Sequence, residues 1–284
     1  MISRLHVLLT ALVVAVSGTG LSTANGGSIS LSAVIDNTPP VIAPTVSPTP
    51  SAYGWNNTEA LVTWNVVALS GVAFSSGCGP STLTAETAAT TLTCSATSGA
   101  GLSAPKSVTI KIDRTPPIVT YSGNAGSYTV DRIVAIKCTA TDPFSNGVAS
   151  GIAATSCQDI VAPAYSFPLG ANTVSAWAVD KADNLGSGST SFTVLVTAGS
   201  LCVLTVQFVQ SSPGFQQLPP WLQAWATALA SAACQLLLAA TSSPDPSDKA
   251  EAIAAYQQLV GALVALGWLA QEQATVLIRL SNGL

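Results

Sequence analysis

The carboxylates that could act together are few, and the densest group lies in the second half of the chain. Asp142, Asp180, Asp183 and Asn184 fall where the pattern predicts loops at strand ends. Three carboxylates and an amide could bind calcium, which takes about six to eight oxygen ligands. Asp and Asn also shape their own turns by side-chain to backbone hydrogen bonds. The turn interpretation is favoured, with calcium as the alternative, because a similar earlier segment, 97–103, has no carboxylate.

The segment SAYGWNNTEA, residues 51–60, gathers aromatic and amide side chains before a predicted strand. Tyr53 and Trp55 could stack on sugar rings, while Asn56 and Asn57 supply hydrogen bonds. These four residues form the best candidate for a ligand-binding patch. The alternative, that Trp55 folds over the end of a hydrophobic core, is favoured.

The sequence contains a single histidine, His6, for catalysis or metal binding. It lies in MISRLHVLLTALVVAVSG, which has the layout of a secretory signal peptide, with a cleavage site after Ala24. The mature chain would then hold no histidine, which excludes Ser-His-Asp and Cys-His hydrolases and His-ligated zinc. A glycosidase-type carboxylate pair is not demanded by the spacing of the acids. The sequence therefore predicts a non-enzymatic protein without a cofactor.

Composition also bears on partners and compartment. Lys and Arg number 9 against 13 Asp and Glu, a net charge of −4, so no basic stripe is present for nucleic acid. The six cysteines, an even number, fit an oxidising compartment. The apolar run of the signal segment is shorter than the roughly 20 residues that cross a bilayer. We therefore expect a secreted or cell-surface protein with no stable membrane span after signal cleavage.

The cysteines fall two to each predicted domain. The pairs in chain order are Cys78 and Cys94, Cys138 and Cys157, and Cys202 and Cys234. Sequence alone permits many connectivities, but Cys78 and Cys157 occupy equivalent places after SGVA and SGIA, while their partners lie in different strands. One local bridge per domain is the economical prediction. A thiolate zinc site is disfavoured because no C-x-x-C pair exists.

The segments that should position these residues form an internal sequence repeat. IDNTPP at 35–40 returns as IDRTPP at 112–117, and SGVAFSSGC at 70–78 aligns with SGIAATSC at 150–157. Each copy carries segments in which apolar and polar residues alternate, as in a strand with one buried face. The alternating apolar residues are Val62, Trp64, Val66, Val108, Ile110 and Ile112, then Val134, Ile136, Cys138, Ala140, Phe192, Val194 and Val196. Repeats of about 80 residues suit one β-sandwich each.

The proline pairs make each IDxTPP motif a stiff extended segment between repeats. Together with GWNNTEALVTW, CSATSGAGLS and VTIKID, the motif resembles the extracellular bacterial Ig-like repeats of surface and secreted proteins. AVDKADNLGSGSTSFTV is similar to the DxAGNxG hairpin of that family, with Asp183 where the family usually has Gly. The resemblance covers residues 34–197 and implies spacer, display or adhesion roles without a specific ligand.

From residue 198 onward Ala, Leu and Gln replace the β-branched pattern. A proline-opened helix is predicted over LPPWLQAWATALASAACQLLLAA, and Asp245 with Pro246 should begin another. The expected buried stripes are Trp225, Leu229, Ala233 and Leu236 in the first helix, and Ile253, Tyr256, Val260, Leu263 and Val264 in the second. AYQQLVGAL and EQATVLIRL resemble the small helical domain that closes some secreted Ig-repeat proteins and hydrolases, which implies no activity. A membrane span is disfavoured because the charge-free stretch is short and contains Gln235.

These observations predict a multidomain chain with two tandem Ig-like antiparallel β-sandwiches followed by a small all-α helical bundle. The predicted domains are a signal peptide 1–24, a linker 25–36, sandwiches 37–113 and 114–197, and a bundle 198–284. The expected function is an extracellular spacer or adhesion module. The alternative is a glycan- or protein-binding accessory region of a secreted hydrolase. Cell-envelope glycan or an extracellular protein is the expected partner, and the sequence does not indicate an oligomeric state.

Overall fold

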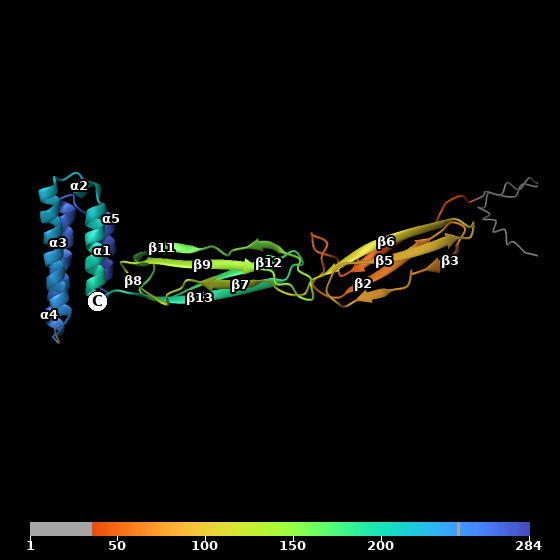
Figure 1. The fold of residues 1–284 in the computed structure, drawn as a ribbon, viewed down its shortest axis with the longest axis horizontal. Helices are drawn as coiled ribbons and strands as arrows, with labels where there is room; N and C mark the ends of the chain where they lie inside the picture. The colour runs from red at the N-terminus through yellow and green to blue at the C-terminus, as the bar shows by residue number, and fades with distance from the viewer. Residues whose placement is uncertain (1–35, 243–244) are drawn as a thin grey trace, which may run out of the picture. The chain divides into compact units, whose positions relative to one another are not determined.

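The computed structural model describes residues 36–242 and 245–284, and contains two β-sandwiches followed by helices (Figure 1). This arrangement confirms the predicted fold class. The predicted signal peptide, 1–24, and nearly all of the predicted linker, 25–36, lie outside the described residues.

The first sandwich has two three-stranded sheets, with strand orders β1-β2-β4 and β3-β5-β6. Every pairing between neighbouring strands in these two sheets is antiparallel. Its strands are β1 (Val41–Ser47), β2 (Ala60–Val67), β3 (Val72–Ser76), β4 (Ser81–Leu83), β5 (Thr87–Ser98) and β6 (Ser103–Ile112).

The alternation predicted for the first sandwich is the alternation observed. Val62 of β2 is fully buried and packs with Ile110 and Ile112 of β6, while Trp64 and Val108 cover this cluster from its edge. The apolar faces of β2 and β6 therefore point into the sandwich, and the intervening Thr and Lys residues are less buried. In β3, by contrast, Val72 and Phe74 are exposed.

The second sandwich has a four-stranded sheet of order β10-β12-β13-β8 and a three-stranded sheet of order β11-β9-β7. One pairing departs from the predicted antiparallel pattern, because β8 runs parallel to β13 along Ser127–Thr129. The strands are β7 (Ile118–Ser122), β8 (Ser127–Thr129), β9 (Ile133–Thr141), β10 (Ile152–Thr155), β11 (Ile160–Pro163), β12 (Gly170–Asp180) and β13 (Leu185–Leu195), with a 3-10 turn η1 at Ala164–Ser166.

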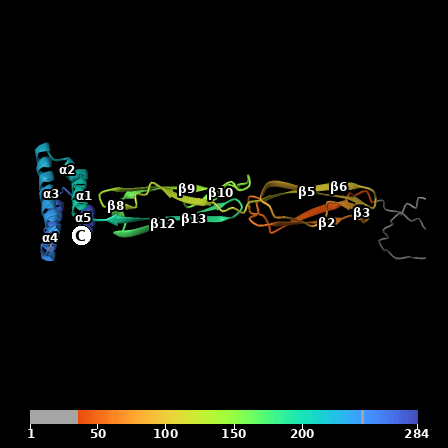
Figure 2. The same ribbon diagram turned by 60° about the horizontal axis from the view of Figure 1, so that its bottom comes forward.

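Side-chain caps begin two of the helices, and the cap at Asp245 is the one that the sequence predicts. Thr197 and Ser200 form a reciprocal capping box at the start of α1, and Asp245 accepts a hydrogen bond from the Ser247 amide with Pro246 in the first helical position of α4. The helices are α1 (Ala198–Ser211), α2 (Pro213–Gln216), α3 (Pro220–Thr241), α4 (Pro246–Ala265) and α5 (Gln271–Ser281). Figures 1 and 2 both show α1, α3, α4 and α5 lying alongside one another.

The buried face of α3 differs from the predicted one. The buried residues are Ala226, Ala230, Cys234 and Leu237, whereas Trp225 is 54% exposed and Leu229 is only partly buried. The side chains of Ala233 and Leu236 lie outside those described. Small alanines and the bridge from Cys234 to Cys202 bring α3 close to α1, so the residue after each predicted one faces inward. The stripe predicted for α4 is confirmed at Tyr256, Val260 and Leu263, which are buried.

The helices share a core with the second sandwich. Phe192 and Val194 of β13 belong to the same buried cluster as Leu201 and Phe208 of α1 and Leu280 of α5. The Tyr165 and Phe208 rings meet edge to face at 5.1 Å. The helical region therefore covers one end of the sandwich inside a single hydrophobic core.

The chain divides into two compact units that cut across the repeat boundaries. Unit 1 comprises residues up to Pro117 together with Asp142–Ala153 and Val179–Leu185, which are loops and strand ends of the second repeat. Unit 2 comprises Ile118–Thr141, Ala154–Ala178 and Gly186–Leu284. Asp142, Asp180 and Asp183 of the second repeat thus belong to unit 1.

Candidate functional site

The acidic site is built around Asp113, which directly follows β6 and is fully buried. Its Oδ1 accepts a hydrogen bond from the Thr115 amide at 3.0 Å, and its Oδ2 accepts one from the Ser150 amide at 2.7 Å. The Asp113 amide in turn donates to the Asn56 carbonyl at 3.0 Å. The aspartate of the repeated IDxTPP motif is therefore fixed on three sides inside unit 1.

Asp180 forms the turn that the sequence predicts. Its Oδ1 accepts from the amides of Ala182 at 2.8 Å and Asn184 at 2.9 Å, and its Oδ2 accepts from the Asn184 Nδ2 at 2.8 Å. The same Asn184 amide group also donates to the Asp113 carbonyl at 2.9 Å. The turn after β12 is thereby attached to the residue that ends β6.

Asp142 follows β9 and completes the site. Its Oδ2 accepts from the Gly151 amide at 2.5 Å, whereas its buried Oδ1 has no hydrogen-bond partner. Burial raises the pKa of the Asp142 carboxyl, and the carboxylates of Asp113 and Asp180 raise it further. The site therefore disfavours the negative charge of Asp142.

Oxygen atoms of these three carboxylates, Asp113, Asp142 and Asp180, all lie within 4.8 Å of one another. Lys181 brings its ammonium near the site, since a Cβ placed on Gly151 would lie 3.5 Å from Nζ. Within residues 36–242 and 245–284 no ion pair joins a cation to any of the three carboxylates. We call Asp113, Asp142 and Asp180 the acidic triad.

Of the acidic residues predicted from sequence, the structure brings Asp142 and Asp180 together and leaves Asp183 out. Asp183 is exposed and takes a left-handed backbone conformation with φ of 68°, which explains why Gly is usual there in the resembling family. Asn184 serves the turn. Sequence reasoning missed Asp113 because its motif reads as a linker, although its repetition at Asp36 was a signal for a side-chain role.

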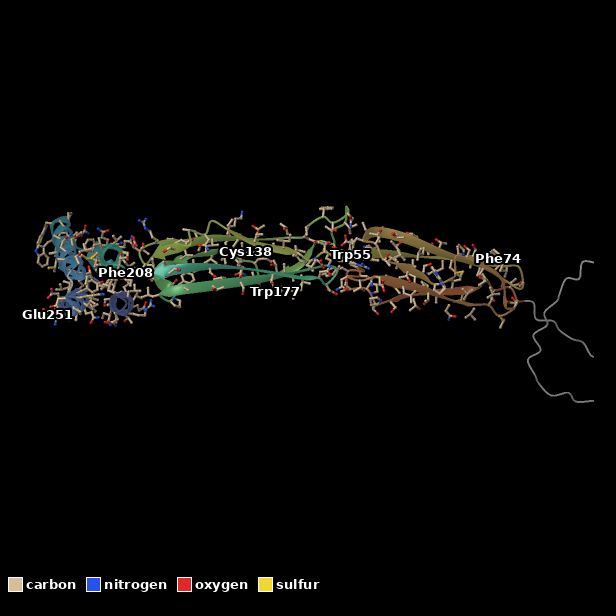
Figure 3. The ribbon with its side chains drawn as sticks, turned by 90° about the horizontal axis from the view of Figure 1, so that it is seen from below. Trp55, Phe74, Cys138, Trp177, Phe208 and Glu251 are labelled. Atoms are coloured by element: carbon tan, nitrogen blue, oxygen red, sulfur yellow. A yellow bond between two sulfur atoms is a disulfide. The ribbon has the colours of Figure 1, made fainter. Side chains whose placement is uncertain are left out.

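The aromatic and amide patch is only partly a surface feature. Tyr53 is 52% exposed and Asn57 is exposed, while Trp55 is half-buried with the Lys111 ammonium 5.5 Å from its ring centre. Asn56 is buried, and its Nδ2 donates to the Pro48 carbonyl at 3.0 Å. The structure therefore leaves Tyr53, Asn57 and one side of Trp55 for a ligand and uses Asn56 internally. Figure 3 places Trp55 and Phe74 at opposite ends of the first sandwich.

Three disulfides join the cysteines in the pairs predicted from sequence: Cys78 to Cys94, Cys138 to Cys157, and Cys202 to Cys234. The first two bridges start after equivalent strands, β3 and β10, and end on non-equivalent ones, β5 and β9. No cysteine is free. Such bridges are typical of proteins that work outside the cytoplasm.

One helix among the described residues, at Pro220–Ala239, is long and apolar enough to cross a membrane by length and composition. In the structure this segment packs into the helical bundle through Ala226, Ala230, Cys234 and Leu237. Its outer face carries Trp221, 72% exposed, and Trp225. The segment therefore has a packed inner face and an uncharged, aromatic outer face.

No protein-family model matches the sequence, and no curated protein matches it. Several solved structures are similar at low identity. Protocadherin gamma B2 extracellular cadherin domains 3–6 are 15% identical, with 58% of this chain and 51% of that chain covered and a TM-score of 0.21. The protocadherin gammaB7 EC3-6 cis-dimer is 17% identical over 57% and 51% of the chains with a TM-score of 0.23. The protocadherin gammaB4 extracellular domain is 16% identical over 54% and 32%, also at 0.23.

The chain spans about half the length of the first two of these structures. The strand order and the buried faces described above define the class of this protein: tandem β-sandwich domains followed by C-terminal helices.

Proposed function

We propose that the protein is an extracellular, non-catalytic spacer and adhesion module. The observation that supports this most is that the IDRTPP segment between the repeats is hydrogen-bonded to residues before it and after it in the sequence, all within unit 1. A spacer needs such a junction, because a free linker would let successive domains swing independently.

The hydrogen bonds of this junction come from several directions. The Ser51 hydroxyl of the first repeat donates to the Lys181 carbonyl at 2.6 Å. Glu86 accepts from the Arg114 amide at 3.1 Å and the Thr115 hydroxyl at 2.8 Å, and the Asn146 side chain reaches its other oxygen at 3.4 Å. These contacts order the IDRTPP segment by its side chains as well as by its prolines.

The lack of histidine beyond His6 supports the non-catalytic part of the proposal. The disulfides support the extracellular part, since each sandwich and the helical region contains one. A small β-sandwich gains stability from such a bridge through the constraint on its unfolded chain.

A second candidate function is the binding of glycan or protein, as in an accessory region of a secreted hydrolase. The exposed aromatic residues favour it, because Tyr53 near Trp55 and the exposed Trp221 and Trp225 offer ring faces to a ligand. Exposed aromatic side chains are also enriched in protein interfaces.

The proposal can be tested in source cells from which the coding sequence is deleted and then restored, as the parent or as a variant. Externally added protease should cleave the protein on intact cells or in the medium, and its cysteines should be oxidised. Cell attachment should fall on deletion and be restored by the Tyr53→Ala/Trp55→Ala chain as well as by the parent. Phe74→Ala, an exposed aromatic at the other end of the same sandwich, is the matched control.

Failure of the Tyr53→Ala/Trp55→Ala chain to restore attachment, with success of Phe74→Ala, would favour the binding function. Saturable binding of the purified chain on a glycan array would identify the ligand class. A protein that stays reduced inside the cell would contradict the extracellular proposal.

A further inference from the structure

We propose that the acidic triad of Asp113, Asp142 and Asp180, together with the Ser150 hydroxyl, is a binding site for one calcium ion. The site lies wholly within unit 1. It goes beyond a spacer function and does not depend on it, because binding of the ion can be measured on the isolated protein.

The first argument is that the turns of this fold do not require the triad. In the first repeat the residue equivalent to Asp180 is Ser98, and its hydroxyl accepts from the Leu102 amide at 3.3 Å as the Asp180 carboxylate accepts from Asn184. The residue that follows the equivalent strand is Ala68 in place of Asp142. One aspartate per junction is therefore enough to build the turns, and the second repeat brings in two more.

The second argument is a buried oxygen without a partner. Ser150 has an exposed fraction of 6%, and its buried Oγ has no partner in hydrogen-bond geometry. The hydroxyl lies beside the triad, because the Ser150 amide donates to the Asp113 Oδ2 at 2.7 Å. Although it is outside hydrogen-bond geometry, the hydroxyl is close enough to Asp142 to lower the pKa of that carboxyl. The Asp142 Oδ1 is also buried and unpartnered. Unsatisfied buried oxygens are costly, and a cation would satisfy both.

The third argument is electrostatic. Asp113 and Asp180 are fully buried, and no ion pair within the described chain offsets their charges or that of Asp142. Like charges this close disfavour one another strongly in a poorly solvated site. A bound cation would attract all three carboxylates and so offset their mutual repulsion.

Acceptor capacity remains for the ion. A carboxylate offers about four lone-pair sites. Asp113 uses two of its sites, Asp180 three and Asp142 one in the hydrogen bonds described above. Every member of the triad can thus bind a cation without losing its hydrogen bonds to the backbone.

The chemistry of the donors selects calcium. All the donor atoms of the site are hard oxygens, whereas zinc and copper sites use mainly nitrogen and sulfur ligands. All six cysteines are in disulfides, so none offers a thiol. Magnesium demands near-ideal octahedral geometry and keeps its water, whereas calcium accepts irregular sets of about six to eight oxygens. Loops from two repeats give such an irregular set, which water can complete.

The test is isothermal titration of the full chain after chelator treatment, with calcium chloride and separately with magnesium chloride. We expect one calcium per chain with a dissociation constant of about 10⁻⁴ to 10⁻³ M, the range of extracellular modules. The melting temperature of the calorimetric transition of unit 1 should rise with calcium.

Asp142→Asn is the decisive variant, because its amide oxygen still accepts from Gly151 while the charge is removed. We expect calcium binding at least about tenfold weaker, with a calcium-free melting temperature equal to or above that of the parent. Asp183→Asn removes one nearby exposed charge and is the matched control, expected to bind like the parent.

Three outcomes would overturn the proposal. The first is no heat of binding and no shift in melting temperature at about 10 mM calcium, which is well above the expected dissociation constant. The others are equal responses to magnesium and calcium, and unchanged calcium binding by Asp142→Asn. If Asp142 were only structural, the variant would lower the melting temperature alike with and without calcium.

Discussion

The junctions at the start of the two repeats share one backbone framework and differ in charge. The Ser98 amide donates to the Leu102 carbonyl at 2.8 Å, and the Asp180 amide donates to the Asn184 carbonyl at 3.1 Å. Asp36 accepts from the Ser70 amide at 3.0 Å as Asp113 accepts from Ser150. Because both junctions make these hydrogen bonds, the fold needs only the residues that they share. The two further acids of the second junction, Asp142 and Asp180, have no acidic counterpart in the first.

The largest effect should come from removing the turn residue at each junction in the presence of chelator. Asp180→Ala removes the carboxylate that accepts from the Ala182 and Asn184 amides and from the Asn184 side chain, which keeps its bond to the Asp113 carbonyl, so unit 1 should lose about 3 kcal/mol. Ser98→Ala removes one hydrogen bond and should cost about 1 kcal/mol. Urea unfolding followed by tryptophan fluorescence measures both. Equal losses would mean that the two turns are held by the backbone alone.

The second prediction rebuilds the triad in the first repeat. Ala68→Asp with Ser98→Asp would place two acids beside Asp36, and without calcium we expect a loss of about 1 to 3 kcal/mol from unpaired charge. With calcium the loss should be recovered, and titration should show two ions per chain in place of one. A double variant that is destabilised but still binds one ion would show that the first junction cannot form the site.

A smaller effect separates Asp183 from its counterpart Gly101, which share a left-handed backbone with φ of 68° and 81°. Asp183→Gly should stabilise unit 1 by about 0.5 to 1 kcal/mol, because glycine adopts this conformation without strain. Gly101→Asp should destabilise it by a similar amount. The midpoints of urea unfolding test the pair, and changes of the same sign would contradict the equivalence of the two turns.

The smallest effect concerns acid. The Thr38 hydroxyl, followed by the Thr38 amide and Ser70, lowers the pKa of Asp36 from 3.8 to about 2. The stabilising contribution of Asp36 is therefore present above its unfolded-state pKa and is lost as the pH falls from about 4 toward about 2. Asp36→Asn should make unit 1 less dependent on pH in this window. Glu59→Gln, an exposed acid of the same unit, controls for the loss of one charge. An unchanged pH profile in Asp36→Asn would show that the Thr38 contact does not persist in solution.

Much of the fold followed from the sequence because period-two alternation is a local property of the chain. Val62, Ile110 and Val134 are buried as the pattern predicts. The turn at Asp180 and Asn184 was also predictable, since its hydrogen bonds join residues only a few positions apart.

Properties that depend on distant partners could not be predicted in this way. Asp113 meets Asp142 only because loops of the second repeat pack into unit 1, and no local pattern records that contact. Trp225 was expected inside because it begins a stripe of apolar residues at helical spacing, but the bridge of Cys234 to α1 turns the neighbouring face of α3 inward and leaves this ring exposed. The common core of the helices and the second sandwich was likewise hidden, because amphipathicity indicates a buried face and not what covers it.

If the protein is extracellular as proposed, the composition of the two units has a consequence for how the chain emerges from a translocation channel. Unit 1 includes Val179–Leu185, so the N-terminal sandwich cannot complete its junction until that hairpin has passed the channel. The core of unit 2 spans from Tyr128 to Leu280, and its assembly must therefore wait until Leu280 has emerged. We expect partially exported chains to expose apolar surface and to need the protection of chaperones during export, with unit 1 becoming protease-resistant before unit 2.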